Sequence, residues 1–543
     1  MITVSNLSLS FGGSTLFKDV DLLFGEGNCY GLIGANGAGK TTFLKILSGE
    51  IDPTTGDVSI DAKKRMSILK QDHFAFDEYT VMDTVIMGNK HLYNIGRKKD
   101  ALYAKEDFSE ADGHACAELE AEFSELGGWE AESDAQKLLQ GLGLPDELTS
   151  DAANIEMKSL GGNEKVKILL AQALFGNPDI ILLDEPTNHL DIDAVAWLEE
   201  FLSEYFGTVI VVSHDRHFLN NVCTHTVDID YGKIRMYVGN YEFWYEVSQL
   251  NQRIQKQQNK KTEEKIKELQ SFIQRFSANK SKSKQATSRK KLLDKITVDE
   301  IPASSRRYPF IGFEPDREAG KDILELKDLT KKNPEGGYFF KDVSFTVSKG
   351  DKIAFLGDCE QAVSALFRVL SGEDTDFEGT FKWGGTTSLS YFPIDSDHFF
   401  DGLSENIIEW LRQYSTKDET ETYLRGFLGR MLFSGDEVYK SVSVLSGGEK
   451  VRCMFSRMML FGSNVLILDH PTSHLDLESI AAVNNGLLDF KGNVLFASHD
   501  HEIVETVANR VIEVHENGCF DKQGTYTEYL EWRRENHKGS FIL

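Results

Sequence analysis

The chain has 543 residues, of which 41% are hydrophobic and 27% charged, an ordinary composition for a globular protein with two or more domains. Its formal net charge of −27 argues against a protein that coats nucleic acid with its whole surface. The sequence has no run of about 18 apolar residues, no signal-peptide pattern and no C-x-x-C pair among its six cysteines. These features predict no transmembrane helix and favour the reducing cytoplasm.

A phosphate-binding loop follows the first apolar segments. Residues 34–41 read G-A-N-G-A-G-K-T, which matches the pattern G-x-x-x-x-G-K-[ST]. The glycines leave backbone N–H groups free to surround phosphate oxygens, and the lysine supplies positive charge. The residues in and directly after this segment that we expect to bind a nucleotide are Gly34, Asn36, Gly37, Ala38, Gly39, Lys40, Thr41 and Thr42.

An insertion at about residues 88–130 has no counterpart in the second half of the chain. Within it, apolar residues alternate with acids, which indicates an acidic helical hairpin. A surface elaboration without a binding role remains an equal alternative. The apolar residues are Ala117, Leu119, Ala121, Phe123 and Leu126.

An apolar strand pattern ends at Asp184, and His214 follows 30 residues later. Asp469 and His499 repeat this pattern with the same spacing of 30 residues. Apolar strand patterns alternate with helical ones in both halves. We therefore predict two similarly folded α/β domains with largely parallel sheets, at residues 1–239 and 321–543.

Residues 240–320 are predicted to be a linker between the two domains, with a long helix over residues 241–276. Residues 251–310 contain sixteen Lys or Arg and six Asp or Glu, a net charge of +10. Such a concentration of positive charge is typical of segments that contact nucleic acid. A solvated helix that only joins the domains could have the same composition. The basic residues expected at the tip of the linker are Lys280, Lys282, Lys284, Arg289, Lys290 and Lys291.

The second copy of the phosphate loop has lost the residues that a phosphate needs. Residues 357–364 read G-D-C-E-Q-A-V-S, so Val363 replaces the lysine and Glu360 replaces a glycine. Valine supplies no charge, and glutamate brings a negative charge towards an anion. This half is therefore expected to bind a phosphate chain poorly.

Three further motifs identify the fold more closely than the phosphate loop. Residues 445–449 read L-S-G-G-E, residues 184–191 read D-E-P-T-N-H-L-D, and residues 213–215 read S-H-D. Their order and spacing, beside a charged linker, resemble the ABC-F family over nearly the whole chain. The resemblance implies two tandem P-loop ATP-binding-cassette domains joined by a helical linker. It also implies a cytosolic ATPase that acts on the ribosome as a translation factor or ribosome-protection protein.

In this family the cassettes close head to tail within one chain, and each ATP lies between one phosphate loop and the opposite signature. The resemblance implies ATP and Mg²⁺ as ligands, with Thr41, Gln71 and Asp184 around the metal. Glu185 would orient the attacking water, and His214 would contact the γ-phosphate. Phe11 is expected to stack on adenine, although a packing role is the alternative. The residues expected to cap this ATP from the second half are Ser446, Gly447, Gly448 and Glu449.

The second composite site would combine the changed phosphate loop, His470 and the first-half signature. His470 stands where the first half has the glutamate after the strand. That signature reads Ser159-Leu160-Gly161-Gly162-Asn163, with Leu160 at the expected serine position. Because the changes fall in one composite site, we predict a single working ATPase site. Pairing of the two cassettes within one chain, which the resemblance implies, predicts a monomer.

Two other functions stay open at this level. An energising ATPase subunit of a membrane transporter would share the cassettes, but the long basic linker would lack a purpose. A scaffold that uses ATP only to set its shape would need little hydrolysis. The leading hypothesis places the linker against rRNA or tRNA near the ribosomal exit site, with no membrane partner.

Overall fold

The computed structural model describes residues 1–11, 14–70, 72, 74–105, 109–188, 190, 192–276, 306, 308–334, 336–357, 360–415, 420–473 and 475–536. The chain forms two compact bodies. The first comprises Met1–Asn188, Trp197–Ser213 and the described part of Phe218–Ser305, and the second comprises His189–Ala196, His214–His217 and Arg306–Leu543. None of the helices within these described ranges combines the length and the apolar character needed to cross a bilayer.

The first body contains a six-stranded sheet in the order β5-β6-β7-β3-β8-β9. All neighbours are parallel except the edge pair β8 and β9. The central strands are apolar runs buried on both faces, as expected for a parallel sheet covered by helices. The strands are β3 (Cys29–Gly34), β5 (Met66–Ile68), β6 (Ile180–Asp184), β7 (Thr208–Val212), β8 (His225–Asp230) and β9 (Lys233–Val238).

A three-stranded antiparallel sheet packs onto this sheet through one apolar core, in which Phe17 contacts Phe43 edge to face. Its strands are β1 (Ile2–Phe11), β2 (Ser14–Phe24) and β4 (Thr55–Ile60). The helices of the first half include α1 (Lys40–Leu47), α2 (Val81–Ile86), α5 (Ala131–Gly141), α6 (Asp146–Ser150), α7 (Gly162–Leu174), α8 (Ile192–Ser203) and α9 (Arg216–Val222).

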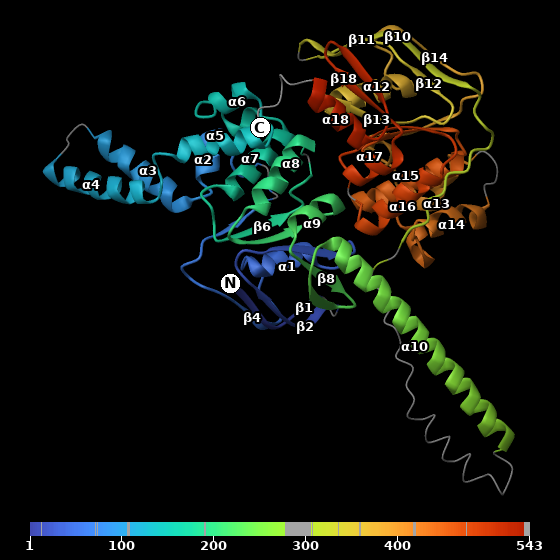
Figure 1. Cartoon of the computed structure of the whole chain (residues 1–543), viewed down its shortest axis with the longest axis horizontal. Coiled ribbons are helices and arrows are strands. Elements are labelled where there is room, and N and C mark those ends of the chain that lie inside the picture. Colours follow the sequence, from blue (N-terminus) through green and yellow to red (C-terminus); the bar gives the residue numbers. More distant parts are fainter. Residues whose placement is uncertain are drawn as a thin grey trace. The chain divides into compact units, whose positions relative to one another are not determined.

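Two helices span the predicted insertion. They are α3 (Lys90–Tyr103) and α4 (Glu110–Glu125), which lie side by side and project from the first body (Figure 1). Ser109 caps α4 by accepting a hydrogen bond from the Asp112 N–H at 3.2 Å, and the Asp112 carboxylate accepts from Ser109 in return. The Tyr103 hydroxyl donates to Glu120 at 2.7 Å, which ties α3 to α4.

Helix α10 (Tyr241–Phe276) begins on the first body and extends away from it (Figure 1). Tyr241 and Trp244 are buried against that body and anchor the first turn, whereas Leu250 and Ile254 further along are exposed. This helix matches the long helix predicted at the start of the linker. The predicted basic tip, residues 280–291, lies outside the described residues.

The second body repeats the architecture of the first. Its six-stranded sheet has the order β15-β16-β17-β13-β18-β19, which matches the first sheet strand by strand. The prediction of two tandem α/β cassettes is therefore confirmed. The strands of both its sheets are β10 (Asp322–Lys332), β11 (Tyr338–Val343), β12 (Thr346–Ser348), β13 (Lys352–Gly357), β14 (Glu378–Trp383), β15 (Leu389–Phe392), β16 (Val465–Asp469), β17 (Asn493–Ala497), β18 (Arg510–His515) and β19 (Gly518–Gln523).

Helices of the second half pack around a large apolar core that includes Trp410, Phe455 and Phe490. They include α12 (Glu360–Ser371), α13 (Ile407–Arg412), α14 (Glu421–Arg430), α15 (Gly447–Phe461), α16 (Leu477–Asp489), α17 (His501–Val507) and α18 (Tyr526–Asn536).

The second body begins earlier than the expected boundary at residue 321. Residues 308–320, which we call the strap, run across it before β10 starts. Ile311 and Phe313 belong to its core, and the Phe310 N–H donates to the Arg430 carbonyl at 2.8 Å. The sequence suggested a linker here, but burial of these apolar side chains fixes the strap to the second body.

We expect Phe313→Ala to destabilise the second body by about 3 kcal/mol, because it removes a buried ring that packs edge to face on Phe490 at 5.9 Å. Phe310→Ala is the matched control on the same strap, since that ring is 61% exposed and its loss should cost below about 1 kcal/mol. Differential scanning calorimetry of both variants measures the difference. Equal shifts in the two variants would contradict the docked strap.

Candidate nucleotide-binding sites

The intact phosphate loop connects the central strand β3 to helix α1. Gly37 and Gly39 adopt left-handed backbone angles, with φ of 80° and 100°. A Cβ atom at Gly34 would lie 2.8 Å from the Ile229 carbonyl oxygen of the neighbouring strand β8. Glycine is therefore required at three positions, for backbone angle or for space.

Lys40 begins α1 and is only 8% exposed. Its Nζ donates to the Gly34 carbonyl at 2.8 Å and to the Ala35 carbonyl at 3.4 Å, so the ammonium group lies against the loop itself. Thr41 follows in the first turn of α1. The N-terminus of α1 adds partial positive charge and N–H donors, which suit a phosphate chain.

Asp184 and Glu185 lie at the same sheet edge as this loop. Asp184 ends β6, which pairs with β7, and β7 in turn pairs with β3. Glu185 has φ of 52°, an uncommon angle for a residue other than glycine, and its N–H donates to the Val212 carbonyl at 2.8 Å. Such a left-handed residue is held by its surroundings, and these residues concentrate at functional sites.

The segment after Glu185 is also tied to the end of β7. The hydroxyl groups of Thr187 and Ser213 are 3.2 Å apart, and His214 follows Ser213 directly. Of the other expected ligands, the whole of Gln71 and the side chain of Phe11 lie outside the described residues.

These side chains fit a nucleotide with Mg²⁺. The left-handed glycines, the helix N-terminus and Lys40 suit phosphate oxygens. Thr41 and Asp184 supply the hard oxygen donors that Mg²⁺ prefers, and Mg²⁺ usually takes its other ligands from phosphates and water.

The corresponding loop of the second body is replaced by helix. Val363 aligns with Lys40, yet α12 already begins at Glu360, three residues earlier, where the first body has the left-handed Gly37. Val363 is 3% exposed and packs in the apolar core beside Leu366. An extra helical turn and a buried valine thus occupy the stretch that forms the phosphate cradle in the first body.

His470 keeps the backbone geometry of Glu185 without its carboxylate. Its φ is 48°, its N–H donates to the Ala497 carbonyl at 3.0 Å, and Thr472 and Ser498 repeat the hydroxyl pair at 3.3 Å. The His470 ring stacks on the His499 ring, with centroids 4.3 Å apart. The fold around this position is therefore retained, whereas the anionic group is not.

The signature of the second body is a helix cap. Ser446 precedes α15, and its N–H and its hydroxyl donate to Glu449 Oε2 at 2.8 and 3.0 Å. Lys440 Nζ lies 2.9 Å from the other oxygen of that carboxylate. Ser446 and Gly447 are exposed, so the serine hydroxyl and the helix N-terminus are accessible.

The first-body signature is aligned one residue away from the expected position. Gly161 caps α7, and its N–H donates to Glu164 Oε2 at 2.9 Å, as Ser446 does to Glu449. Gly161, rather than Leu160, therefore corresponds to Ser446. The expectation for Leu160 was wrong because consecutive glycines allow two alignments, and the helix cap decides between them.

A second contact supports this register. The lysine four residues after each cap pairs with an aspartate, Lys165 with Asp77 at 2.5 Å and Lys450 with Asp397 at 2.6 Å. The first-body signature lacks the hydroxyl under either alignment, because residue 160 is leucine and residue 161 is glycine.

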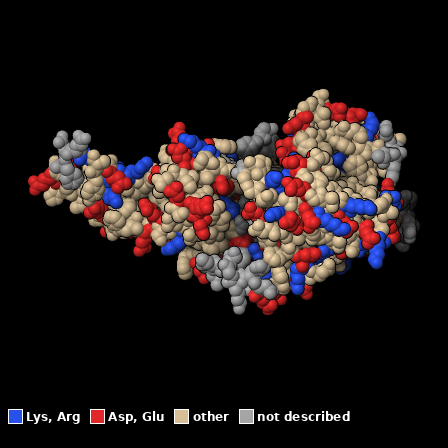
Figure 2. Space-filling model, turned by 90° about the horizontal axis from the view of Figure 1, so that it is seen from above, with Lys and Arg blue, Asp and Glu red and all other residues tan. Residues whose placement is uncertain are grey.

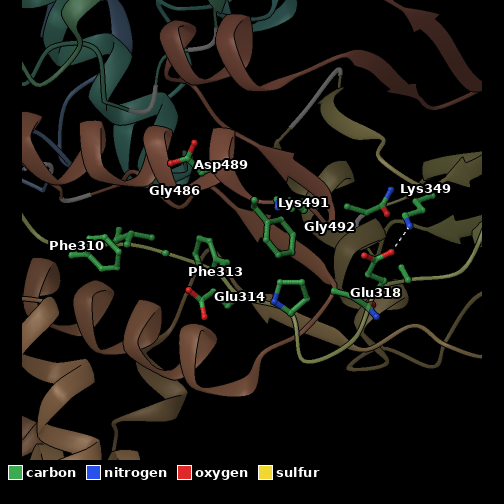
Figure 3. Close-up of a pocket in the computed structure, with 16 residues that line it drawn as sticks. Phe310, Phe313, Glu314, Glu318, Lys349, Gly486, Asp489, Lys491 and Gly492 are labelled. Carbon is green, nitrogen blue, oxygen red and sulfur yellow. Dashed lines mark hydrogen bonds and ion pairs between the residues drawn. The ribbon is translucent and has the colours of Figure 1, made fainter.

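Figure 3 shows a cavity of about 760 Å³ in the second body. Its lining residues Lys349, Asn464 and Asn493 lie where β13, β16 and β17 begin, which is the sheet edge away from the phosphate-loop counterpart. The strap, residues 489–493 between α16 and β17, and Lys349 line it, and Lys349 pairs with Glu318 at 2.9 Å. Lys349 precedes β13, whereas the phosphate-loop counterpart follows β13. The cavity is therefore separate from the nucleotide motifs.

Comparison with known proteins agrees with this description. A family model described as ABC transporter matches residues 17–188 and 340–473, and another with the same description matches residues 227–313. The chain is 60% identical over 531 residues to the uncharacterized ABC transporter ATP-binding protein YkpA of Bacillus subtilis (strain 168), covering 98% of this chain and 97% of that protein.

A more distant relative is the energy-dependent translational throttle protein EttA of Haemophilus influenzae, which is 30% identical over 533 residues, 96% of this chain and 93% of that protein. The solved structure of the RNase-L Inhibitor has a TM-score of 0.60 at 17% identity, over 98% of this chain and 93% of that one, which shows the same fold. Because these matches run through both cassettes and the linker, we conclude that the chain belongs to the ABC transporter family of ATPases, as a tandem-cassette protein of the ABC-F type.

Proposed function

We propose that this protein is a cytoplasmic ATPase that acts on the ribosome and hydrolyses ATP at one composite site. The observation that carries the single site is the difference between the two loops. Helix α1 begins at Lys40 after two left-handed glycines, whereas α12 begins at Glu360 and buries Val363. One loop can surround a phosphate chain, and the other is already filled by protein.

In the working site, the first phosphate loop would pair with the second-body signature of the same chain. Lys40 and the N-terminus of α1 would hold the phosphates, and Thr41 with Asp184 would hold Mg²⁺, which would supply positive charge beside them. Glu185 would accept a hydrogen bond from the attacking water, and His214 would contact the γ-phosphate. Ser446, at the accessible N-terminus of α15, completes the site.

The ribosomal role is supported by the relative EttA, whose name describes an energy-dependent translational throttle. ATP would shift the two cassettes towards a closed state that binds the ribosome, and hydrolysis would return them to the open state. Such a cycle works only if the ribosome binds the closed state more tightly than the open one.

The linker is the proposed RNA-binding element. On the face shown in Figure 2, acidic side chains are spread over the described surface with Lys and Arg between them, in keeping with the net charge of −27. Residues 251–310 carry a net +10 from sixteen basic and six acidic residues. Concentrated positive charge on an acidic protein suits a phosphate backbone, whose contacts position the protein without reading bases.

A transporter-energising role is less well supported. Both classes would use the cassettes, but the basic linker contributes nothing to transport, and its region matches a family model of its own at residues 227–313. Cosedimentation with ribosomes in the absence of detergent separates the two roles.

Each chain should bind one ATP tightly. Lys40→Ala should remove that binding, because the loop loses its only lysine and therefore the positive charge that pairs with the phosphates. Val363→Ala, at the equivalent position of the second body, should leave the stoichiometry at one. Equilibrium dialysis measures both variants, and two tightly bound ATP molecules per wild-type chain would contradict the single-site proposal.

Glu185→Gln should slow ATP hydrolysis by about 10²- to 10⁴-fold, because the amide is a poor acceptor for the proton of the attacking water. The variant should then cosediment with ribosomes in ATP but not in ADP. His470→Gln is the matched control at the same left-handed position and should hydrolyse ATP like the wild type. Ribosome binding that is equally strong in ATP and in ADP would contradict the proposed cycle.

Reversing the charge of Lys282 and Lys284 should weaken ribosome binding and flatten its dependence on salt between about 50 and about 200 mM, because fewer counterions are released. Reversal of Lys327 and Lys332 on β10 is a control that changes the net charge equally outside the linker. The same loss in both variants would mean that overall charge, rather than the linker, decides binding.

A further inference from the structure

The signature of the second body contains an anion beside the place where we propose a phosphate binds. The Glu449 carboxylate accepts from the Ser446 N–H at 2.8 Å and from the Ser446 hydroxyl at 3.0 Å. An ionised carboxylate at this distance from the serine repels an approaching γ-phosphate. It also competes with that phosphate for the proton of the serine hydroxyl.

Lys440 offsets this charge. Its Nζ lies 2.9 Å from Oε1 and 3.0 Å from Oε2 of Glu449, so the ammonium group holds both carboxylate oxygens. The Glu449 side chain is only 22% exposed and that of Lys440 is 37% exposed. Burial raises the pKa of Glu449, but the Ser446 N–H, Lys440 and the Ser446 hydroxyl together hold this pKa below its usual value, so the carboxylate is ionised and paired.

The first body lacks this arrangement. Lys440 lies six residues before the cap Ser446, and the residue six before the cap Gly161 is Ile155. Matching bridges at the next residue, Thr80 with Glu156 and Asn406 with Ser441, confirm the correspondence. Within the described ranges, Glu164 accepts from Gly161 at 2.9 Å and has no ion-pair partner.

The lysine thus occurs in the signature that would face the intact phosphate loop and not in the one that would face the degenerate loop. We propose that Lys440 is a positioning residue for ATP turnover. It fixes and neutralises Glu449, so that the Ser446 hydroxyl can turn from the carboxylate to the γ-phosphate. This inference rests on the composite site of the proposed function.

The contacts of Glu449 explain why its negative charge has to be neutralised. When Ser446 donates its hydroxyl proton to a phosphate, Glu449 loses one of its two bonds to the serine but keeps the Ser446 N–H and the ammonium group. Without Lys440, the carboxylate would be less satisfied and would stand uncompensated near a strongly anionic ligand. ADP lacks the γ-phosphate, so its binding should not depend on Lys440.

The experiment compares ATP and ADP affinity in the full-length Glu185→Gln background, together with kcat and KM in otherwise wild-type protein. Lys440→Met should lower ATP affinity and raise KM by about three- to tenfold, with ADP affinity and the thermal midpoint unchanged. Lys440→Arg should restore ATP affinity. Ile155→Met, at the equivalent position of the first body, is the matched control and should change neither value.

A second variant tests the charge itself. Glu449→Gln keeps an acceptor for the Ser446 N–H but removes the negative charge, so adding it to Lys440→Met should recover most of the lost ATP affinity. Equal losses of ATP and ADP affinity in Lys440→Met, or no recovery in the double variant, would overturn the role of Lys440. If Glu185→Gln protein binds ATP normally but loses nothing on Ser446→Ala, the composite site itself fails, which is a different result.

Discussion

The nucleotide site depends on one constraint, the convergence of parallel strands at the carboxyl edge of the sheet. Strands β3, β6 and β7 are neighbours, so the phosphate loop, Asp184 and the end of β7 meet at that edge although they are far apart in sequence. The hydrogen bond from the Glu185 N–H to the Val212 carbonyl holds Glu185 in its left-handed conformation there. The sheet order thus places the groups that phosphate chemistry needs.

The second body shows that this framework persists without the chemistry. Its sheet has the same order, and His470 has the same left-handed angle and the same kind of bond to the neighbouring strand as Glu185. The loop differs more deeply, because α12 extends to Glu360 and Val363 joins the core. The second body therefore keeps the sheet order and the backbone at His470, whereas its loop has changed in both backbone and sequence.

The two signatures also differ from each other, because only one of them keeps the full set of polar groups. Both helices are capped through a carboxylate three residues after the cap, but only the second has a serine hydroxyl and a lysine paired with that carboxylate. The intact phosphate loop lies in the first body, whereas the signature with the serine and the paired lysine lies in the second.

The sequence by itself determined the repeat, the α/β class and the phosphate loop, because fixed spacing, apolar periodicity and the demands of phosphate on glycine and lysine are local properties. It also showed that Val363 replaces the phosphate-loop lysine and that His470 replaces the glutamate after the strand. Only the tertiary structure decided that α12 replaces the damaged loop, that Gly161 rather than Leu160 caps α7, and that the strap belongs to the second body. Helix starts, caps and the burial of a proline-rich segment depend on contacts between residues distant in sequence, such as Phe313 with Phe490. Composition and spacing do not record those contacts.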